Sequence, residues 1–309
     1  MELVRYDRNP VIAPTSNWWE NKAVFNCAAV RTNGKVHILY RAQGDDDVSR
    51  FGHATAENGL DISERDPDPN YESIGDELER LGVEDPRITK IEDKYYITYT
   101  GVSLYPCSEA RPSPFKSVPW RCRVGLLSTK DFKPYEKHGC ILPDMDNKDV
   151  VLFPEKIKGK YVMLHRTFPN IWMAYSEDLT HWHDHRLLMR VQPGAWDCDR
   201  IGAGAPPIKT ENGWLEVYHG VDHRRNYRIG AMLLDLEDPS KIIGRSVEPL
   251  LGPERDYEKY GLVPNVVFSC GVVEMNDQFF VYYGGGDRVI GVATMSSSDM
   301  KKVKLEQPV

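Results

Sequence analysis

Short stretches in which apolar and polar residues alternate run along the whole chain, and they predict β-strands. The stretches are rich in Val, Ile, Tyr and Phe and are separated by Gly, Asp, Asn and Pro, which is typical of strands joined by turns. Apolar residues at helical spacing are rare. Residues 71–82, YESIGDELERLG, come nearest to it, and we expect one short helix there at most. The pattern therefore predicts an all-β protein.

One strand phrase occurs five times along the chain. Each copy opens with a turn residue, alternates, and reaches an aromatic residue or His at its seventh place. The copies are GKVHILYR (34–41), DKYYITYT (93–100), GKYVMLHR (159–166), NGWLEVYH (212–219) and DQFFVYYG (277–284). A second strand-like phrase follows each copy, and a third precedes it. The preceding phrases are FNCAAVRT (25–32), EDPRITK (84–90), FPEKIKG (153–159), GAPPIKT (204–210) and PNVVFSCG (264–271).

The repeat predicts a five-bladed β-propeller, because one small sheet cannot bury both of its faces alone, whereas radially stacked sheets bury each other. The alternative is a β-sandwich with coincidental similarity, but the order of the phrases is the same in all five copies. No linker or low-complexity segment divides the chain, so we expect residues 1–309 to form a single domain. The insert 101–122 is rich in Pro and Ser, and we expect it to form a loop over one face.

Composition limits the classes of function. The net charge of −7 argues against a general affinity for nucleic acid or for an anionic membrane, although it allows a local basic pocket for a small anion. No stretch approaches 18 consecutive apolar residues, and the N-terminus MELVRYDRNP has no apolar region typical of a secretory signal. The six scattered cysteines form no C-x-x-C pair. We therefore expect a cytoplasmic protein with free thiols.

The strand nearest the axis of a propeller blade begins at one mouth of the central channel. If the preceding phrases are these strands, their first polar or Pro residues form a ring around a pocket. The ring residues are then Asn26, Asp85, Glu155, Pro206 and Asn265. In VEDPRITK, Glu84, Asp85 and Arg87 lie where a strand begins, and Pro86 has no ladder donor to lose there. A simpler interpretation is that Asp85 caps a turn and pairs with Arg87, but the predicted ring favours a pocket.

Basic residues are predicted at the same mouth. The eighth place of a copy faces opposite to the seventh because side chains alternate along a strand. Arg offers a planar fork for phosphate oxygens, and Lys offers a point charge. Each basic residue alone is more simply a surface ion pair, but their shared position in the repeat indicates an anion site. The residues at the eighth place are Arg41, Arg166 and His219, and we expect Lys156 and either Arg121 or Arg123 at the same mouth.

The combined phrases resemble glycoside hydrolase family 130, the β-mannoside phosphorylases and their relatives. The matching segments are VEDPRIT, LFPEKIKGKYVMLHR, GAGAPPIKT with GWLEVYHG, DLEDPSKIIGRS, and VPNVVFSCG with YYGGGD. The resemblance covers nearly the whole chain and implies a five-bladed β-propeller. It also implies that inorganic phosphate, a co-substrate rather than a cofactor, attacks a terminal β-mannoside with inversion and gives α-mannose 1-phosphate. An inverting hydrolase needs a second carboxylate to activate water, whereas phosphate is already an anionic nucleophile.

The resemblance also implies roles for single residues. Asp85, in E-D-P-R, is implied as the general acid, whose proton reaches the glycosidic oxygen through a sugar hydroxyl. The implied phosphate ligands are Arg123, Lys156, Arg166 and His219, with Tyr227 as a further candidate. The choice of Arg123 over Arg121 rests on strand alternation. The expected sugar contacts are Asn26, Arg41, Glu84, Arg87 and Asp287, of which Asp287 has a simpler interpretation as a turn acid.

Two other functions stay open. One is an inverting β-mannosidase, a hydrolase on the same fold, and the other is a non-catalytic carbohydrate-binding propeller. The basic residues Lys156, Arg166 and His219 favour phosphorolysis. The linkage, β-1,2 or β-1,4, the acceptor sugar and a homo-oligomeric state are left open.

Three alternating histidines offer a candidate metal site. His181, His183 and His185 in THWHDHR alternate, so on a strand they share one face, and three such imidazoles can bind zinc. The stretch lies at a strand end away from the predicted pocket, which favours solvated imidazoles, and we expect no metal.

Overall fold

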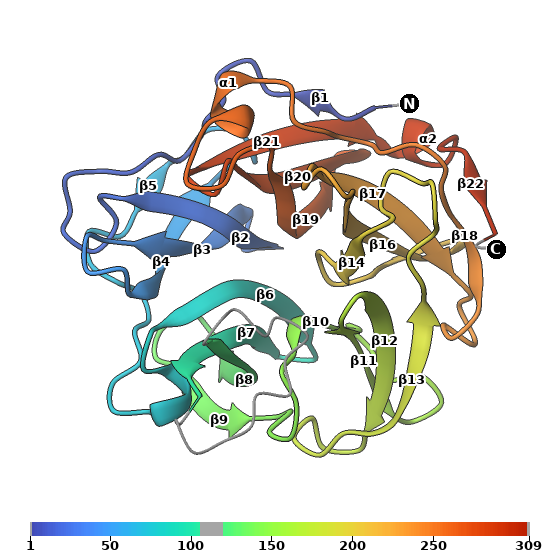
Figure 1. The fold of residues 1–309 in the computed structure, drawn as a ribbon, viewed down its shortest axis with the longest axis horizontal. Coiled ribbons are helices and arrows are strands. Elements are labelled where there is room, and N and C mark those ends of the chain that lie inside the picture. The colour runs from blue at the N-terminus through green and yellow to red at the C-terminus, as the bar shows by residue number, and fades with distance from the viewer. Residues whose placement is uncertain (1, 106–119, 308–309) are drawn as a thin grey trace.

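The computed structural model describes residues 2–105 and 120–307, which form five antiparallel sheets around a central axis (Figure 1). The five-bladed β-propeller predicted from the repeat is thus confirmed. Most of the predicted 101–122 loop, residues 106–119, lies outside the described residues. In the part of the chain that is described, no helix is long and apolar enough to cross a membrane.

The first three blades run in chain order from the axis outward. Their strands are β2 (Ala23–Thr32), β3 (Lys35–Gln43), β4 (Ser49–Ala56) and β5 (Glu64–Arg65); β6 (Val83–Ile91), β7 (Lys94–Leu104), β8 (Trp120–Thr129) and β9 (Glu136–Cys140); and β10 (Lys148–Leu152), β11 (Tyr161–Thr167), β12 (Asn170–Ser176) and β13 (His183–Met189).

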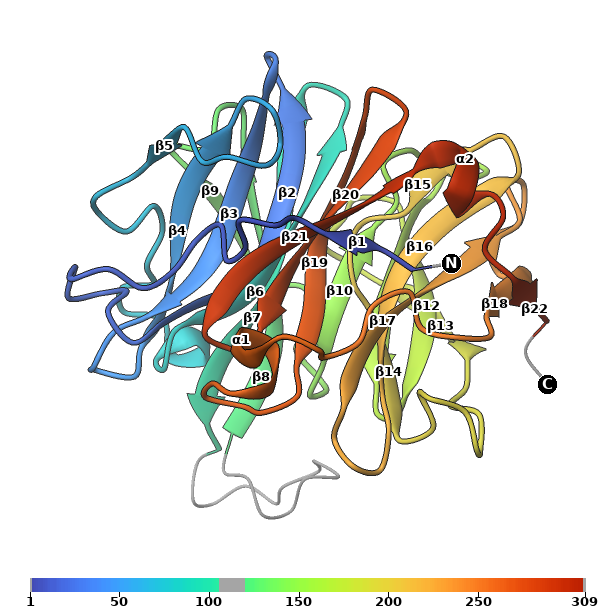
Figure 2. The ribbon, with the colours of Figure 1, turned by 90° about the horizontal axis from the view of Figure 1, so that it is seen from above.

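The last two blades include both ends of the chain. The fourth contains β14 (Arg200–Ala203), β15 (Ile208–Thr210), β16 (Gly213–Val221), β17 (Tyr227–Leu234), β18 (Ile242–Ser246) and β22 (Leu305–Glu306). The fifth contains β19 (Val267–Met275), β20 (Gln278–Gly285), β21 (Val289–Ser296) and β1 (Val4–Arg5). Because β1 is the outermost strand beside β21, the N-terminal segment closes the ring (Figure 2).

Helices are short. They are α1 (Asp256–Lys259), α2 (Ser297–Met300) and a 3-10 turn at Glu77–Glu79. The helix expected within 71–82 is reduced to this 3-10 turn. Gly75 and Gly82 on either side of it have φ angles of 77° and 105°, which a right-handed helix does not contain.

Apolar side chains are buried between neighbouring blades, as the alternation along the strands predicts. Each of the five large clusters combines residues from two adjacent sheets. In β10, for example, Val150 packs with the second blade and Val151 with the fourth. Burial on both faces explains why the strands nearest the axis are apolar over most of their length.

A buried polar unit recurs in the blades and explains the conserved seventh place of the repeat. In four blades a Tyr hydroxyl on the second strand donates to a carboxylate that precedes the first strand, and this carboxylate also pairs with a cation on the fourth strand counted from the axis. The units are Tyr40–Glu20–Arg65, Tyr99–Glu79–Lys137, Tyr218–Asp197–Arg245 and Tyr283–Glu258–Arg5. Each unit therefore ties the segment entering a blade to the second and the fourth strand of that blade.

The cross-strand neighbour of the tyrosine is a glycine. A Cβ atom at Gly52 would lie 2.2 Å from Cζ of Tyr40, and one at Gly125 would lie 2.2 Å from Cζ of Tyr99. A larger residue there would displace the ring from the carboxylate.

Candidate active site

A cavity of about 440 Å³ lies at the end of the ring axis where the innermost strands begin. All five blades contribute to its lining. The lining residues include Asn26, Arg41, Asp85, Trp120, Cys122, Asn147, Lys148, Asp149, Arg166, Arg200, Tyr227, Phe268 and Asp287.

Three of the innermost strands carry the same irregularity where they enter the cavity. The pairing of β2, β6 and β10 with the next strand shifts register there, and one residue at each bulge has a positive φ. These residues are Asn26 (47°), Asp85 (50°) and Asp149 (58°). Asn and Asp tolerate the left-handed conformation better than most residues, and a bulge can re-aim a side chain. The repeated device thus presents three short polar side chains to one cavity.

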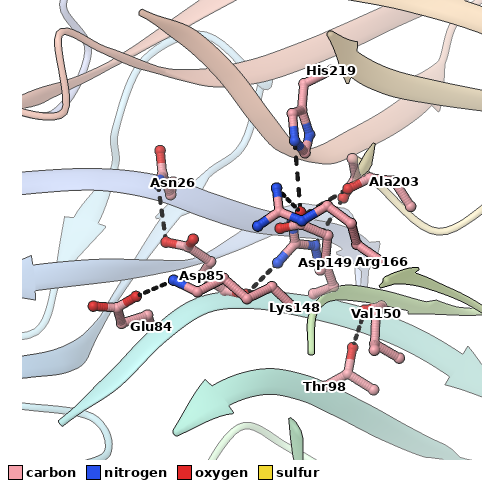
Figure 3. A network of polar contacts seen from close by, with 12 residues as sticks. Asn26, Glu84, Asp85, Thr98, Lys148, Asp149, Val150, Arg166, Ala203 and His219 are labelled. Atoms are coloured by element: carbon pink, nitrogen blue, oxygen red, sulfur yellow. Dashed lines mark hydrogen bonds and ion pairs between the residues drawn. The ribbon is translucent and has the colours of Figure 1, made fainter. Parts of the chain in front are cut away.

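Acidic groups gather on the side formed by the first, second and fifth blades. Figure 3 shows two of them, Glu84 and Asp85, with Asn26 beside Asp85. Asn26 donates to Oδ1 of Asp85 at 2.9 Å, and Nη1 of Arg41 lies 3.4 Å from the same oxygen. Nη2 of Arg41 pairs with Oε1 of Glu84 at 2.7 Å. Burial raises the pKa of Asp287, and although Arg41 lowers it, the charges of Asp85 and Glu84 raise it further, to about 7.

Basic groups meet around Asp149 on the opposite side (Figure 3). Nη1 of Arg166 lies 2.8 Å from Oδ2 of Asp149, and Nη2 of Arg87 lies 2.9 Å from Oδ1. Nε2 of His219 is 3.6 Å from Oδ2. Burial raises the pKa of Asp149, but Arg166, His219 and Arg87 together lower it more, so it is held below its ordinary value. Asp149 is therefore an anionic anchor for the arginines.

Lys148 connects the two sides. Its Nζ atom lies 3.2 Å from Oε2 of Glu84. Burial lowers the pKa of Lys148, but Cys122, Glu84 and Asp85 raise it above its ordinary value. The side chain therefore stays a cation next to the cavity.

His219 forms the floor behind the basic side. Its ring is fully buried. The centroid of this ring lies 4.3 Å from that of Phe268 and 6.4 Å from that of Tyr227. Burial lowers the pKa of His219 to about 3, so the imidazole is neutral at pH 7. Among the described residues, neither ring nitrogen has a hydrogen-bond partner. At the cavity wall, the Cζ atom of Arg200 lies 5.8 Å from the centroid of the Tyr227 ring.

The structure brings most of the expected site residues together. Those that line the cavity are Asn26, Arg41, Asp85, Arg166, Tyr227 and Asp287. Glu84 and His219 lie behind the lining and contact residues that form it. Their roles in catalysis and binding stay predictions.

Arg87 has a different place from the one expected. It is 1% exposed and donates to the backbone carbonyls of Asp85, Ala203 and Gly204, in addition to pairing with Asp149. Asp85 and Asp149 line the cavity but Arg87 itself does not, so Arg87 joins the second, third and fourth blades from behind the lining instead of facing a sugar.

Lys156 lies outside the cavity, contrary to the expected anion site. It is exposed, and its Nζ atom lies 4.4 Å from the centroid of the Tyr161 ring. Glu155 pairs at the surface with Lys209. The reason is the register of the third blade, whose innermost strand begins at Lys148, before the phrase FPEKIKG.

In the fourth blade, too, the innermost strand begins earlier in the chain than the sequence pattern predicts. Its innermost strand begins at Arg200, so Pro206 follows the strand and does not open it. The ring position assigned to Glu155 belongs to Asp149.

Neither Arg123 nor Arg121 is part of the cavity lining. Arg123 donates to the carbonyl of Pro143 and pairs with Asp146 at 2.7 Å, whereas Nε of Arg121 donates to Ser103. Cys122, between them, lines the cavity. Side chains alternate along this strand as expected, but the one that reaches the cavity is Cys122 and not either of the flanking arginines.

Lys148, Asp149 and Arg200 were missed in the sequence. A signal for Asp149 exists, because Asn26 and Asp85 each stand 14 residues before the seventh place of their copy, and Asp149 stands 16 before it. The two-residue insertion in the third copy concealed this match. Lys148 comes directly before Asp149, just as Glu84 comes directly before Asp85 in the second blade.

The alternating histidines do not share partners. His181 bonds Asp178, His183 bonds Glu177, and His185 bonds His165. Within residues 2–105 and 120–307, no group of three or more His, Cys, Asp or Glu is arranged to hold a metal ion.

Comparison with known proteins identifies close relatives of the chain. Residues 5–305 match the sequence model of a family described as beta-1,4-mannooligosaccharide phosphorylase. A 1,2-beta-oligomannan phosphorylase of Thermoanaerobacter sp. (strain X514) is 44% identical over 97% of this chain and 99% of its own length. A beta-1,4-mannooligosaccharide phosphorylase of Ruminococcus albus is 33% identical over 96% of this chain and 89% of its own length. The structure of a Listeria innocua beta-1,2-mannobiose phosphorylase with beta-1,2-mannobiose has a TM-score of 0.84 at 32% identity and covers 98% of this chain and 99% of its own.

Proposed function

Because the chain belongs to glycoside hydrolase family 130, we propose that it is a β-mannoside phosphorylase that transfers a terminal mannosyl residue to inorganic phosphate. The observation that carries the proposal is the composition of one cavity. Asp85 stands on one side of it, Arg166 stands on the other, and the cation Lys148 lies between them. A cavity of about 440 Å³ suits a mannosyl residue and a phosphate bound together.

The cations form the phosphate side. Lys148 and Arg166 line the cavity from the third blade, and Arg200 and Tyr227 line it from the fourth. Asp149 fixes the guanidinium of Arg166, so the fork does not have to be ordered when the anion binds. Placed in this way, the phosphate is held in line with the anomeric carbon, and the cations balance its charge during the transfer. The neutral His219 supports this wall from behind.

Asp85 supplies the acid. Phosphate oxygen forms a bond to the anomeric carbon while the bond from that carbon to the glycosidic oxygen breaks, and the leaving oxygen takes a proton that comes from Asp85. The family resemblance implies that a sugar hydroxyl relays this proton. Asn26 and Arg41 hold one oxygen of Asp85 and orient the carboxyl group. No second carboxylate is required, because phosphate needs no base to become a nucleophile.

We further propose β-1,2-mannosides as the first substrates to test and β-1,4-mannosides as the second. The 44% identical relative acts on 1,2-beta-oligomannan, and the 33% identical relative acts on β-1,4-mannooligosaccharides. The exposed indole of Trp120 at the cavity is positioned to contact the sugar next to the cleaved bond.

The test is product analysis with β-1,2-mannobiose, β-1,4-mannobiose and mannosyl-glucose, each with and without phosphate. The proposal expects α-mannose 1-phosphate that appears only when phosphate is present. Free mannose at the same rate without phosphate would establish the hydrolase alternative. Sugar binding without any turnover would establish the carbohydrate-binding alternative.

A further inference from the structure

The third blade carries an uncharged version of the polar unit that the other blades share. His165 occupies the place of the tyrosine, Asn147 that of the carboxylate, and His185 that of the cation on the fourth strand. In the other four blades the corresponding groups are a phenol, a carboxylate and a basic side chain. This blade also supplies Lys148 and Arg166 to the cavity.

The hydrogen bonds of the uncharged unit have a defined direction. The backbone N–H of Arg166 donates to Oδ1 of Asn147 at 3.2 Å, which fixes the orientation of the amide. Nδ2 of Asn147 therefore donates to Nδ1 of His165 at 2.9 Å. Nε2 of His165 then carries the proton and donates to Nδ1 of His185 at 3.0 Å. Burial and the neighbouring His185 lower the pKa of His165 to about 3, in agreement with a neutral ring.

Asn147 differs from its four counterparts in its location. It lines the cavity next to Lys148, whereas no carboxylate of the other units belongs to the lining. A carboxylate at this position would add a further negative charge to Asp144, Asp146 and Asp149, which already line the cavity, and would compete with an anionic ligand for the neighbouring cations Lys148 and Arg166. It would also repel that ligand directly, because like charges a few ångströms apart in a partly buried site interact strongly.

We propose that Asn147 is a specificity-determining residue for the anionic substrate, and that His165 and His185 are positioning residues that keep its amide in place without adding charge. The other blades tolerate a carboxylate in their units because it is buried away from the cavity. This inference rests on the proposed function and deepens it, since it names the feature of the third blade that permits phosphate to bind there.

The first test compares two substitutions at one position. Asn147→Asp and Asn147→Ser both remove the amide donor to His165, but only Asn147→Asp adds a negative charge. The neutral imidazole can shift its proton to Nδ1 and donate to the new carboxylate, so the fold is compatible with Asn147→Asp. We expect the KM for phosphate of Asn147→Asp to exceed that of Asn147→Ser by about tenfold or more. The KM for the mannoside should differ by less than about twofold between the two variants.

A control in the next blade separates charge at the cavity from general damage. Asp197→Asn changes the carboxylate of the Tyr218 unit, which is fully buried and is not part of the cavity lining. Its KM for phosphate should equal that of the wild type. Equal phosphate KM values for Asn147→Asp and Asn147→Ser would overturn the proposal.

A second pair of variants tests the positioning role and decides the matter if Asn147→Asp does not fold. His165→Leu removes the acceptor for Asn147, whereas the amide of His165→Gln can accept from Asn147 and donate to His185. We expect His165→Leu to raise the KM for phosphate several-fold without a matching change for the mannoside, and His165→Gln to restore most of the loss. Equal phosphate KM values in these two variants would contradict the positioning role. Failure of the proposed function is recognised separately, because the wild type would then show no phosphate-dependent turnover.

Discussion

Asp149→Asn tests the anchor of the phosphate side. The substitution keeps the size of the side chain but removes a buried charge that lies 2.8 Å from Arg166 and 2.9 Å from Arg87. Removing one partner of a buried ion pair costs about 3–5 kcal/mol. Arg87 keeps three backbone carbonyl acceptors, and Arg166 is partly open to the cavity, so we expect the lower end, about 3 kcal/mol.

The expected change in melting temperature follows from the size of the protein. An unfolding entropy of about 2.1 cal/mol/K per residue gives roughly 0.65 kcal/mol/K for this chain, so 3 kcal/mol corresponds to a decrease in Tm of about 5 °C. The pKa of Asp149 is below its ordinary value in the folded protein, so its stabilisation is present above about pH 4 and is lost as the pH falls further.

The assay is differential scanning calorimetry at pH 7 and at several values down to pH 4, together with phosphate kinetics at pH 7. Arg166 loses its anchor, so the KM for phosphate should rise at least several-fold. A Tm within about 1 °C of the wild type at pH 7 would show that the arginines do not depend on Asp149. A difference in Tm that grows toward pH 4 would contradict the assigned charge.

Three further outcomes are expected. Asp85→Asn should lower kcat by about 10²–10⁴-fold in product analysis, and a variant that keeps a tenth of the rate would rule out general acid catalysis by this residue. Lys148→Ala should raise the KM for phosphate about tenfold or more, whereas Lys156→Ala, at the surface, should leave it unchanged; the opposite result would restore the assignment made from the sequence. The raised pKa of Asp287 means that the folded protein holds a proton between about pH 4 and 7 that the unfolded chain releases, so the free energy of unfolding should fall as the pH rises through this window. Asp287→Asn should flatten that dependence in denaturant titrations, and an unchanged slope would argue against it.

The ring of blades was predictable because its signal is repeated. The seventh places, from Tyr40 to Tyr283, recur in a fixed context, and the structure shows that they are all buried second-strand residues. The eighth places Arg41 and Arg166 reach the cavity for the simple reason that side chains alternate on a strand. The alternation of side chains depends only on a short segment of the chain, so it can be predicted without knowledge of the distant contacts.

The innermost strand of the third blade was not predictable in the same way. FPEKIKG resembles the second-blade phrase EDPRITK in its Pro and acidic residues. The sequence pattern therefore favours it as the innermost strand over the segment that begins with Lys148 and Asp149. What defines the position is a bulge with a left-handed residue, which depends on backbone geometry and is only weakly encoded by an Asp or Asn. The partners of Arg87 and Arg123 lie up to 117 residues away in sequence, and no periodicity predicts such pairs.

The placement of β1 beside β21 sets the order in which a newly made chain can be completed. Residues 4 and 5 are synthesised long before their partners, residues 294 and 293. At about 5–20 residues per second, the first strand waits roughly 15–60 s for its neighbour during synthesis. Removal of β1, or a bulky group attached next to it, should therefore disturb the completion of the fifth blade, and the other four blades can already be in place when it fails.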